Sequence, residues 1–267
     1  MNINSAIAER ARAGEPLTAA ELDELAAADV LSLGMLADEV RRLRTGDTVT
    51  YSRDADTRLT TLPAMLSDTV SAIRDAKAAS NGELIGYSLA DVIDRDWGAL
   101  AGVLEQLKSA GLDAIAEAPV DRIAEPAAAL RTAQAAGLPV RSLSLQRPLS
   151  GSKTAYLLQV REIVTQLPWI HAVAPLPREQ SVAVPTTGYD DVRAVALARL
   201  ALPSVRNIQV DWSQYGPKLA QVALTFGAND LDRVSTVDDE TLGRRRTSVE
   251  DVCRNITAAG FTPAERR

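Results

Sequence analysis

Apolar residues at two different spacings divide the chain into short strands and amphipathic helices. Alternation of apolar and polar residues is typical of strands, and spacings of three and four are typical of helices. The predicted strands are 51–58, 84–88, 113–117, 140–144, 170–174, 206–211 and 230–235. The predicted helices between them are 63–79, 97–110, 126–136, 152–167 and 188–202.

The clearest of these strand–helix units is residues 205–230. Alternating apolar residues predict a strand at 206–211. Pro217 suits the first turn of a helix, because its missing N–H would have no partner there anyway, and Gly227 provides a left-handed residue that ends a helix. The connecting loop, residues 211–216, follows the carboxyl end of the strand, where parallel α/β folds place ligand sites.

The order of the elements predicts the fold class. At least five strands alternate with helices, which is the pattern of a parallel sheet. Residues 51–235 would hold about six strand–helix units at roughly 31 residues each, fewer than the eight of a complete barrel. We therefore predict an α/β fold, an incomplete or degenerate TIM-type (β/α) barrel at 47–235. A helical cap at 1–46 and a helical extension at 236–267 would flank it.

Charge and hydropathy narrow the classes of partner. The formal net charge is −6, which argues against the phosphate backbone of a nucleic acid as partner. No apolar run approaches the ~20 residues that span a bilayer, and the first residues lack the apolar stretch of a signal peptide. We therefore expect a cytoplasmic protein that binds neither nucleic acid nor membrane.

The strand–helix unit at 205–230 and the segment after it also carry a recognisable set of residues. Asn207-Ile208-Gln209 is followed by Trp212, by Gly216-Pro217-Lys218 and by Gly227-Ala228-Asn229-Asp230-Leu231-Asp232. This set resembles the last barrel unit of the radical SAM enzymes of the futalosine route to menaquinone. These enzymes are aminofutalosine synthase and dehypoxanthine futalosine cyclase, with a deazaflavin-synthase relative. Val49-Thr50-Tyr51 likewise resembles the first barrel strand of that family.

The resemblance implies a [4Fe–4S] cluster and SAM, but the cluster motif is absent. In the family, the first strand leads into a CxxxCxxC loop whose three thiolates hold the cluster. Here residues 52–63 contain no cysteine, and the one cysteine of the chain is Cys253. Iron–sulfur clusters need several thiolate ligands. We therefore expect no cofactor, and radical chemistry does not carry over from the resemblance.

Seven residues at the predicted carboxyl ends of strands are candidate ligand contacts: Asp54, Asp56, Arg58, Glu117, Arg147, Asp211 and Trp212. The first three replace the cluster loop and would share one face of an extended segment. An exposed polar strand edge is the alternative there, and core packing is the alternative for Trp212. With His171 as its one histidine, the chain offers little for a nucleophilic triad and no two-histidine metal site.

Two functions fit these observations. We favour a non-radical partner or scaffold subunit, a pseudoenzyme, because an incomplete barrel would leave unpaired strand edges that invite another chain. Its partner would be a second copy, giving a homo-oligomer, or a cluster-bearing homologue, giving a hetero-oligomer. The alternative is a non-radical enzyme or binder of an aromatic carboxylate or a nucleoside intermediate of menaquinone biosynthesis. Its predicted contacts are Arg58, Arg147, Asp211 and Trp212.

Overall fold

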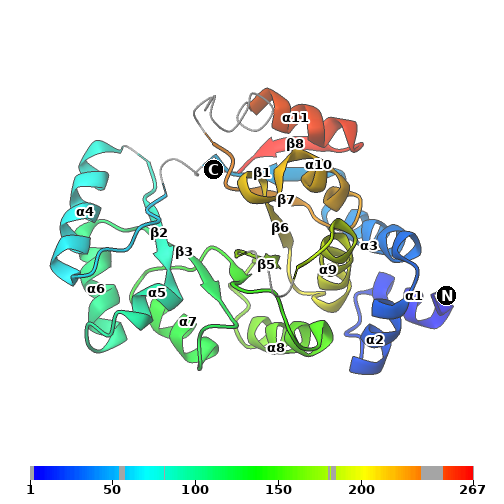
Figure 1. Ribbon diagram of the computed structural model, residues 1–267, viewed down its shortest axis with the longest axis horizontal. Coiled ribbons are helices and arrows are strands. Elements are labelled where there is room, and N and C mark those ends of the chain that lie inside the picture. Colours follow the sequence, from blue (N-terminus) through cyan, green and yellow to red (C-terminus); the bar gives the residue numbers. More distant parts are fainter. Residues whose placement is uncertain are drawn as a thin grey trace. The chain divides into compact units, whose positions relative to one another are not determined.

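The computed structural model describes residues 3–53, 58–80, 82–179, 181, 185–235 and 249–266. The chain forms two compact units (Figure 1). The larger unit comprises Met1–Asp56 and Arg147–Arg267, and the smaller unit comprises Thr57–Gln146. Strand pairings within each unit are parallel. The predicted fold class, an incomplete TIM-type (β/α) barrel, is confirmed.

The larger unit contains a five-stranded sheet in the order β5-β6-β7-β1-β8. The strands are β1 (Thr48–Tyr51), β5 (Ala172–Pro177), β6 (Asn207–Asp211), β7 (Asp230–Asp232) and β8 (Thr262–Glu265). Its helices are α1 (Ser5–Ala13), α2 (Ala19–Ala27), α3 (Val30–Thr45), α8 (Lys153–Gln166), α9 (Gly188–Ala201), α10 (Trp212–Leu224) and α11 (Val249–Ala258). The first strand of the chain therefore lies between two of the last strands.

The core of the larger unit lies on one face of this sheet. Val49, Ile208 and Leu231 alternate with polar residues along their strands and are fully buried. Helices α3 and α9 pack against each other, and α3 also meets Phe226 through Gly34. A Cβ at Gly34 would lie only 2.6 Å from Cε1 of Phe226, so glycine permits this close approach.

The smaller unit contains the sheet β2-β3-β4. Its strands are β2 (Ile85–Ser88), β3 (Ala114–Pro119) and β4 (Leu143–Leu145), and its helices are α4 (Leu66–Ala79), α5 (Leu89–Asp94), α6 (Leu100–Ala110) and α7 (Pro126–Ala135). The amide of Leu59 donates to the carbonyl of Ile85 at 2.9 Å, and Tyr87 donates to the carbonyl of Leu59 at 2.7 Å. This extended residue therefore covers part of the outer edge of β2.

The carboxyl-terminal segment differs from the helical extension that we predicted. Helix α11 is present, but it is followed by β8, which pairs with the edge of β1. The amides of Thr262 and Arg266 donate to Asp47 and Tyr51, both at 2.8 Å. This edge of β1 is therefore covered by the chain itself.

The predicted loop at 211–216 is instead one turn of helix at the start of α10. Oδ1 of Asp211 accepts a hydrogen bond from the amide of Gln214 at 3.0 Å, so a residue expected to face a ligand also caps this turn. Gly216, with a φ of 72°, interrupts the helix, and the second part begins at Pro217 as predicted. Helix α5 was not predicted. Among the described residues, no helix is long and apolar enough to cross a bilayer.

Candidate functional site

Strand register gathers polar side chains on the face of the larger sheet opposite to its apolar core. Gln209 and Asp211 on β6 are aligned with Asp230 and Asp232 on β7, and Thr50 on β1 is aligned with Asp230. Aligned residues point to the same side, and residues two apart along a strand share a face. These polar residues stand near the carboxyl ends of their strands, which is the usual position of sites in parallel α/β folds.

Asp211 is held by two arginines. Nη1 of Arg178, just after β5, lies 3.1 Å from Oδ2 of Asp211, and Nη1 of Arg233 lies 3.4 Å from the same oxygen. Ser213 donates its hydroxyl to Oδ1 of Asp211 at 2.8 Å. The side chains of Arg178 and Asp211 are only 5% and 1% exposed, so this ion pair is buried.

Asp230 and Asp232 share another arginine, Arg266, which follows β8. Its Nη1 lies 3.0 Å from Oδ2 of Asp230, and its Nη2 lies 3.6 Å from Oδ1 of Asp232. Gln209 donates from Nε2 to Asp230 at 2.6 Å, and the hydroxyl of Thr50 donates to the same carboxylate. Burial raises the pKa of Asp230 above its ordinary value, although Arg266 and these two donors oppose the shift.

These six charged residues form one connected group, which we call the aspartate–arginine cluster: Asp211, Asp230, Asp232, Arg178, Arg233 and Arg266. Arg178 connects its two halves, because its Nη2 also lies 3.5 Å from Oδ2 of Asp232. Three carboxylates and three guanidinium groups balance in charge. The cluster can therefore exchange one internal partner for a ligand group of the same sign without leaving a buried charge uncompensated.

Cys253 lies on the other side of the sheet from this cluster. Its Sγ is 3.8 Å from the hydroxyl of Tyr51. Tyr51 alternates along β1 with Thr50 and Ser52, so its side chain points to the apolar face. Burial, followed by the contact with Cys253, raises the pKa of Tyr51 to about 12. The one thiol of the chain is therefore not a member of the candidate site.

The structure places the predicted site residues in different environments. Asp211 belongs to the cluster, and Trp212 is fully buried in the core. Arg147 is largely exposed, with Nε 3.6 Å from Oε2 of Glu179. Arg58 and Glu117 are buried in the smaller unit, where Glu117 is aligned with Ser88 of β2.

Asp54 and Asp56 lie outside the described residues. The predicted pocket that would bring Arg58, Arg147, Asp211 and Trp212 together draws on both units and stays a prediction. Sequence reasoning missed the other five members of the cluster, namely Arg178, Asp230, Asp232, Arg233 and Arg266. Alternation of polar residues in Asn207–Asp211 and Asp230–Asp232 was the available signal for two of them.

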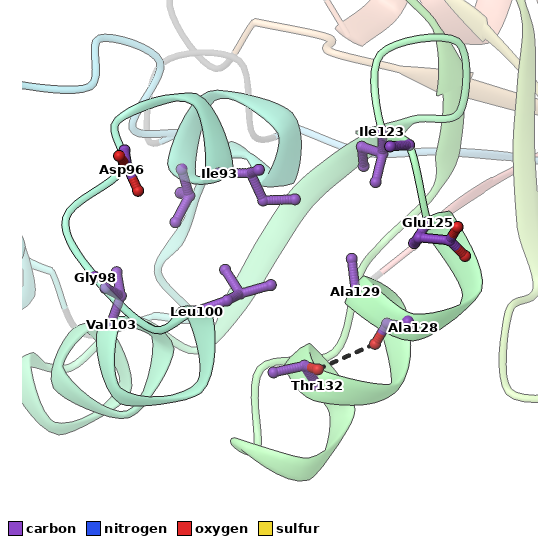
Figure 2. Close-up of a pocket in the computed structure, with 12 residues that line it drawn as sticks. Ile93, Asp96, Gly98, Leu100, Val103, Ile123, Glu125, Ala128, Ala129 and Thr132 are labelled. Carbon is purple, nitrogen blue, oxygen red and sulfur yellow. Dashed lines mark hydrogen bonds between the residues drawn. The ribbon is translucent and has the colours of Figure 1, made fainter.

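A cavity of about 410 Å³ in the smaller unit is a second candidate binding site. Figure 2 shows Ile93, Leu100, Ile123 and Ala129 facing it from α5, α6, the segment before α7, and α7 itself. Thr132, on its wall, donates its hydroxyl to the carbonyl of Ala128 at 3.0 Å. The lining is mostly apolar, so this cavity offers few groups that could orient a polar ligand.

Residues 161–267 match the family model described as the CofH/MqnC C-terminal region. This range contains every residue of the aspartate–arginine cluster. The chain is related to CofH/MqnC-type radical SAM synthases. The resemblance that we noted in the sequence is thus supported at the level of this wider group, and the futalosine route in particular stays a prediction.

Curated relatives of the chain include three archaeal proteins named 5-amino-6-(D-ribitylamino)uracil--L-tyrosine 4-hydroxyphenyl transferase. The protein of Methanothermobacter thermautotrophicus is 36% identical over 108 residues, which are 38% of this chain and 29% of the relative. That of Methanosarcina barkeri is 31% identical over 201 residues, covering 61% and 52%. That of Archaeoglobus fulgidus is 25% identical over 205 residues, covering 71% and 59%. The chain thus matches less than two thirds of the length of each.

Solved structures agree with the fold. Methylornithine synthase (PylB) aligns with a TM-score of 0.70 and 15% identity, covering 97% of both chains. The [FeFe]-hydrogenase maturase HydG aligns with a TM-score of 0.64 and 12% identity, covering 97% of this chain and 74% of the other. At these identities the likeness shows the fold and nothing about ligands.

The residues present do not fit the [4Fe–4S] cluster that this relation implies. Ser52 and Arg53 follow β1 where the first thiolates would stand, and the sequence has no cysteine before Cys253. That thiol lies on the opposite side of β1 from Ser52. Within the described ranges, no three His, Cys, Asp or Glu side chains are arranged to hold a metal ion. The donor set that such a cluster requires is therefore missing from this chain.

Proposed function

We propose that this chain is a relative of the CofH/MqnC-type synthases that lacks an iron–sulfur cluster. We propose that it binds a small polar organic molecule at the aspartate–arginine cluster. The observation that carries the proposal is the burial of this charge-balanced group at the carboxyl ends of β5, β6, β7 and β8. Buried ion pairs add little net stability compared with an apolar core. Their concentration on one face of a barrel-type sheet therefore favours a role in recognition.

The chemistry of the cluster indicates the kind of ligand. Guanidinium groups recognise carboxylates through paired hydrogen bonds, and aspartates accept hydrogen bonds from hydroxyl or amino groups. The names of the curated relatives include L-tyrosine and a ribitylaminouracil, which are molecules with such groups. We extend the proposal to aromatic carboxylates and nucleosides of the futalosine route to menaquinone. The binding requires no cofactor.

Calorimetric titration tests this function. The ligands are L-tyrosine, 5-amino-6-(D-ribitylamino)uracil and aminofutalosine, and each is titrated into the wild type and into the Asp211→Asn variant. We expect at least one ligand to bind the wild type and to bind the variant at least tenfold more weakly. The Arg254→Met variant is the control, because Arg254 is exposed, lies outside the cluster and was not predicted to contact a ligand. Equal affinity for the wild type and Asp211→Asn, or no binding by any of the three ligands, contradicts the proposal.

The expected absence of an iron–sulfur cluster has its own test. Anaerobic reconstitution with iron and sulfide should leave the purified protein colourless, because Cys253 alone cannot replace three thiolates. Stoichiometric iron and sulfide that remain bound after desalting would show that this part of the proposal is wrong. The Cys253→Ser variant then reports whether the one thiol takes part.

A role as partner or scaffold subunit is a second proposal, and a different observation favours it. The exposed face of α3 carries Leu31, Met35 and Leu43, whose exposed fractions are 66%, 75% and 64%. Large apolar side chains exposed together on one helix are typical of a protein contact. Since β8 covers the edge of β1, we now expect a second copy or a cluster-bearing homologue to bind at α3 rather than at a strand edge.

Sedimentation velocity and pull-down with a cluster-bearing homologue test this second proposal. Met35→Glu should abolish the association, whereas Met65→Glu, at another exposed methionine in the smaller unit, should not. A strictly monomeric wild type that captures no homologue contradicts it. We place both roles in the cytoplasm, away from nucleic acid and membrane, in keeping with the net charge of −6.

A further inference from the structure

Asp230 is the most enclosed carboxylate of the cluster, and its partner arginine is among the least enclosed members. The side chain of Asp230 is 0% exposed and that of Arg266 is 29% exposed. Arg266 enters from the residue after β8, and its Nη1 lies 3.0 Å from Oδ2 of Asp230. The guanidinium group therefore stands between this carboxylate and solvent, and Asp230 can meet another cation only if Arg266 moves.

The side chain of Gln209 shows that the hydrogen bonding around Asp230 is incomplete when Arg266 is in place. Nε2 of Gln209 donates to Asp230 at 2.6 Å, which fixes the orientation of the carboxamide. Its other polar atom, Oε1, is buried and has no hydrogen-bond partner in the part of the chain that the structure describes. Gln209 is only 1% exposed. Buried acceptors are normally satisfied, so this oxygen indicates a donor that arrives from elsewhere.

The strand that carries Arg266 is suited to releasing it. β8 has four residues and pairs with β1 on one side. Thr262 and Glu265, at its two ends, are exposed. Short elements with few buried side chains open locally at lower free energy than the core strands do. Arg266 can therefore withdraw from Asp230 without disturbing the β6-β7-β1 pairings.

We propose that Asp230 and Gln209 form a subsite for the primary ammonium group of a ligand, and that Arg266 occupies this subsite until the ligand displaces it. An ammonium group has three donors, so it can satisfy Oδ2 of Asp230 and Oε1 of Gln209 together. An α-amino acid also brings a carboxylate, with which the displaced guanidinium pairs. The inference rests on the proposed function, because it names the ligand class of the same site.

Titration with three matched probes tests this subsite. The probes are L-tyrosine, tyramine, which lacks the carboxylate, and 3-(4-hydroxyphenyl)propionate, which lacks the ammonium group. We expect the wild type to bind both amines at least tenfold more tightly than 3-(4-hydroxyphenyl)propionate. Arg266→Met should bind tyramine at least tenfold more tightly than the wild type, because the internal competitor is gone. Arg254→Met, at an exposed arginine on α11, is the control and should change nothing.

A second variant keeps the test decisive if Arg266→Met fails to fold. Gln209→Met retains the pair between Arg266 and Asp230, and it should weaken both amines at least fivefold while leaving 3-(4-hydroxyphenyl)propionate unaffected. Binding of 3-(4-hydroxyphenyl)propionate as tightly as the amines overturns the subsite but leaves the proposed function intact. Weaker binding of tyramine by a folded Arg266→Met also overturns it. If none of the three probes and neither other pathway ligand binds any variant, the proposed function itself has failed.

Discussion

The guanidinium group of Arg178 reaches from the end of β5 to the carboxylate of Asp211 on β6, with Nη1 3.1 Å from Oδ2. Both side chains are almost completely enclosed, and the same arginine also contacts Asp232 on β7. One residue thus neutralises charges at the ends of two further strands. Arg178 is also the most buried arginine of the cluster, because its side chain is 5% exposed whereas those of Arg233 and Arg266 are 25% and 29% exposed.

Replacing Arg178 with methionine should destabilise the protein by about 3–5 kcal/mol, because Asp211 and Asp232 would remain buried without this partner. Urea denaturation measures the free energy of unfolding. Arg147→Met is the matched control, since its pair with Glu179 is exposed, and it should change stability by less than about 0.5 kcal/mol. Equal effects of the two substitutions would show that the cluster contributes no more than a surface ion pair.

The buried carboxylate of Asp230 should make stability fall as the pH rises. Burial raises its pKa in the folded protein, whereas an unfolded aspartate titrates near about 3.9. The folded state therefore holds the proton more tightly. The stability that this residue contributes is complete below the unfolded pKa and is lost as the pH rises through the folded pKa.

The comparison of wild type with Asp230→Asn isolates this effect. As the pH rises above about 4, the free energy of unfolding of the wild type should decrease relative to that of the variant. Asp29→Asn is a control of opposite sign, because hydrogen bonds from Ser32 lower the pKa of Asp29. The free energy of unfolding of the wild type should exceed that of Asp29→Asn above the unfolded pKa, and this difference should be lost as the pH falls. A difference in unfolding free energy between the wild type and Asp230→Asn that does not change with pH would contradict the raised pKa of Asp230.

Gly34 and Gly102 should respond in opposite ways to alanine. A Cβ at Gly34 would lie 2.6 Å from the ring of Phe226, so Gly34→Ala should force α3 away from this ring and cost about 1–3 kcal/mol. Nothing lies within 4 Å of a Cβ at Gly102, which is also helical. Gly102→Ala should therefore stabilise the protein by about 0.5–1 kcal/mol. Thermal unfolding of both variants distinguishes packing from helix propensity.

Pro263 should limit pairing at the outer side of β8. The amides of Thr262 and Arg266 face β1, so the backbone nitrogen of Pro263 faces outward, where it has no hydrogen to donate. Pro263→Val restores an outward N–H and should increase self-association in sedimentation velocity. Thr262→Val adds similar apolar bulk without a new outward donor, and it should leave the wild-type distribution unchanged. Equal self-association of the two variants would show that added apolar surface, and not the outward N–H, causes the association.

Local patterns in the sequence predicted most of the strands and helices, because each depends on spacing within a few residues. The strand ending at Asp211 and the helix after Pro217 were found where expected. Spacing placed the first strand at 51–58, whereas β1 is Thr48–Tyr51, the position that the family resemblance indicated. The single helical turn between Asp211 and Gly216 was missed, since a short polar stretch has no clear period. The strand nature of 262–265 was missed for a similar reason, because its pairing with β1 rather than its sequence defines it.

The candidate site was predictable only in part, because its members come together through pairings that are distant in sequence. Asp211 was found from its place at the end of a strand. The contact of Thr50 with Asp230 joins residues 180 apart, and no local spacing reveals it. Trp212 was an open choice between ligand surface and core, and its complete burial favours the core.

The position of β1 between β7 and β8 has a consequence for how the protein acquires its structure. The smaller unit is one continuous segment, whereas the larger unit combines two segments, one from each side of it. Contacts between distant segments form slowly, because the entropy cost of closing a long loop comes before the contacts contribute any stability. We therefore expect refolding to show the smaller unit protected from amide exchange first. The charged site would form last, because it requires β1 to pair with β7 and β8, which lie far from it in the sequence.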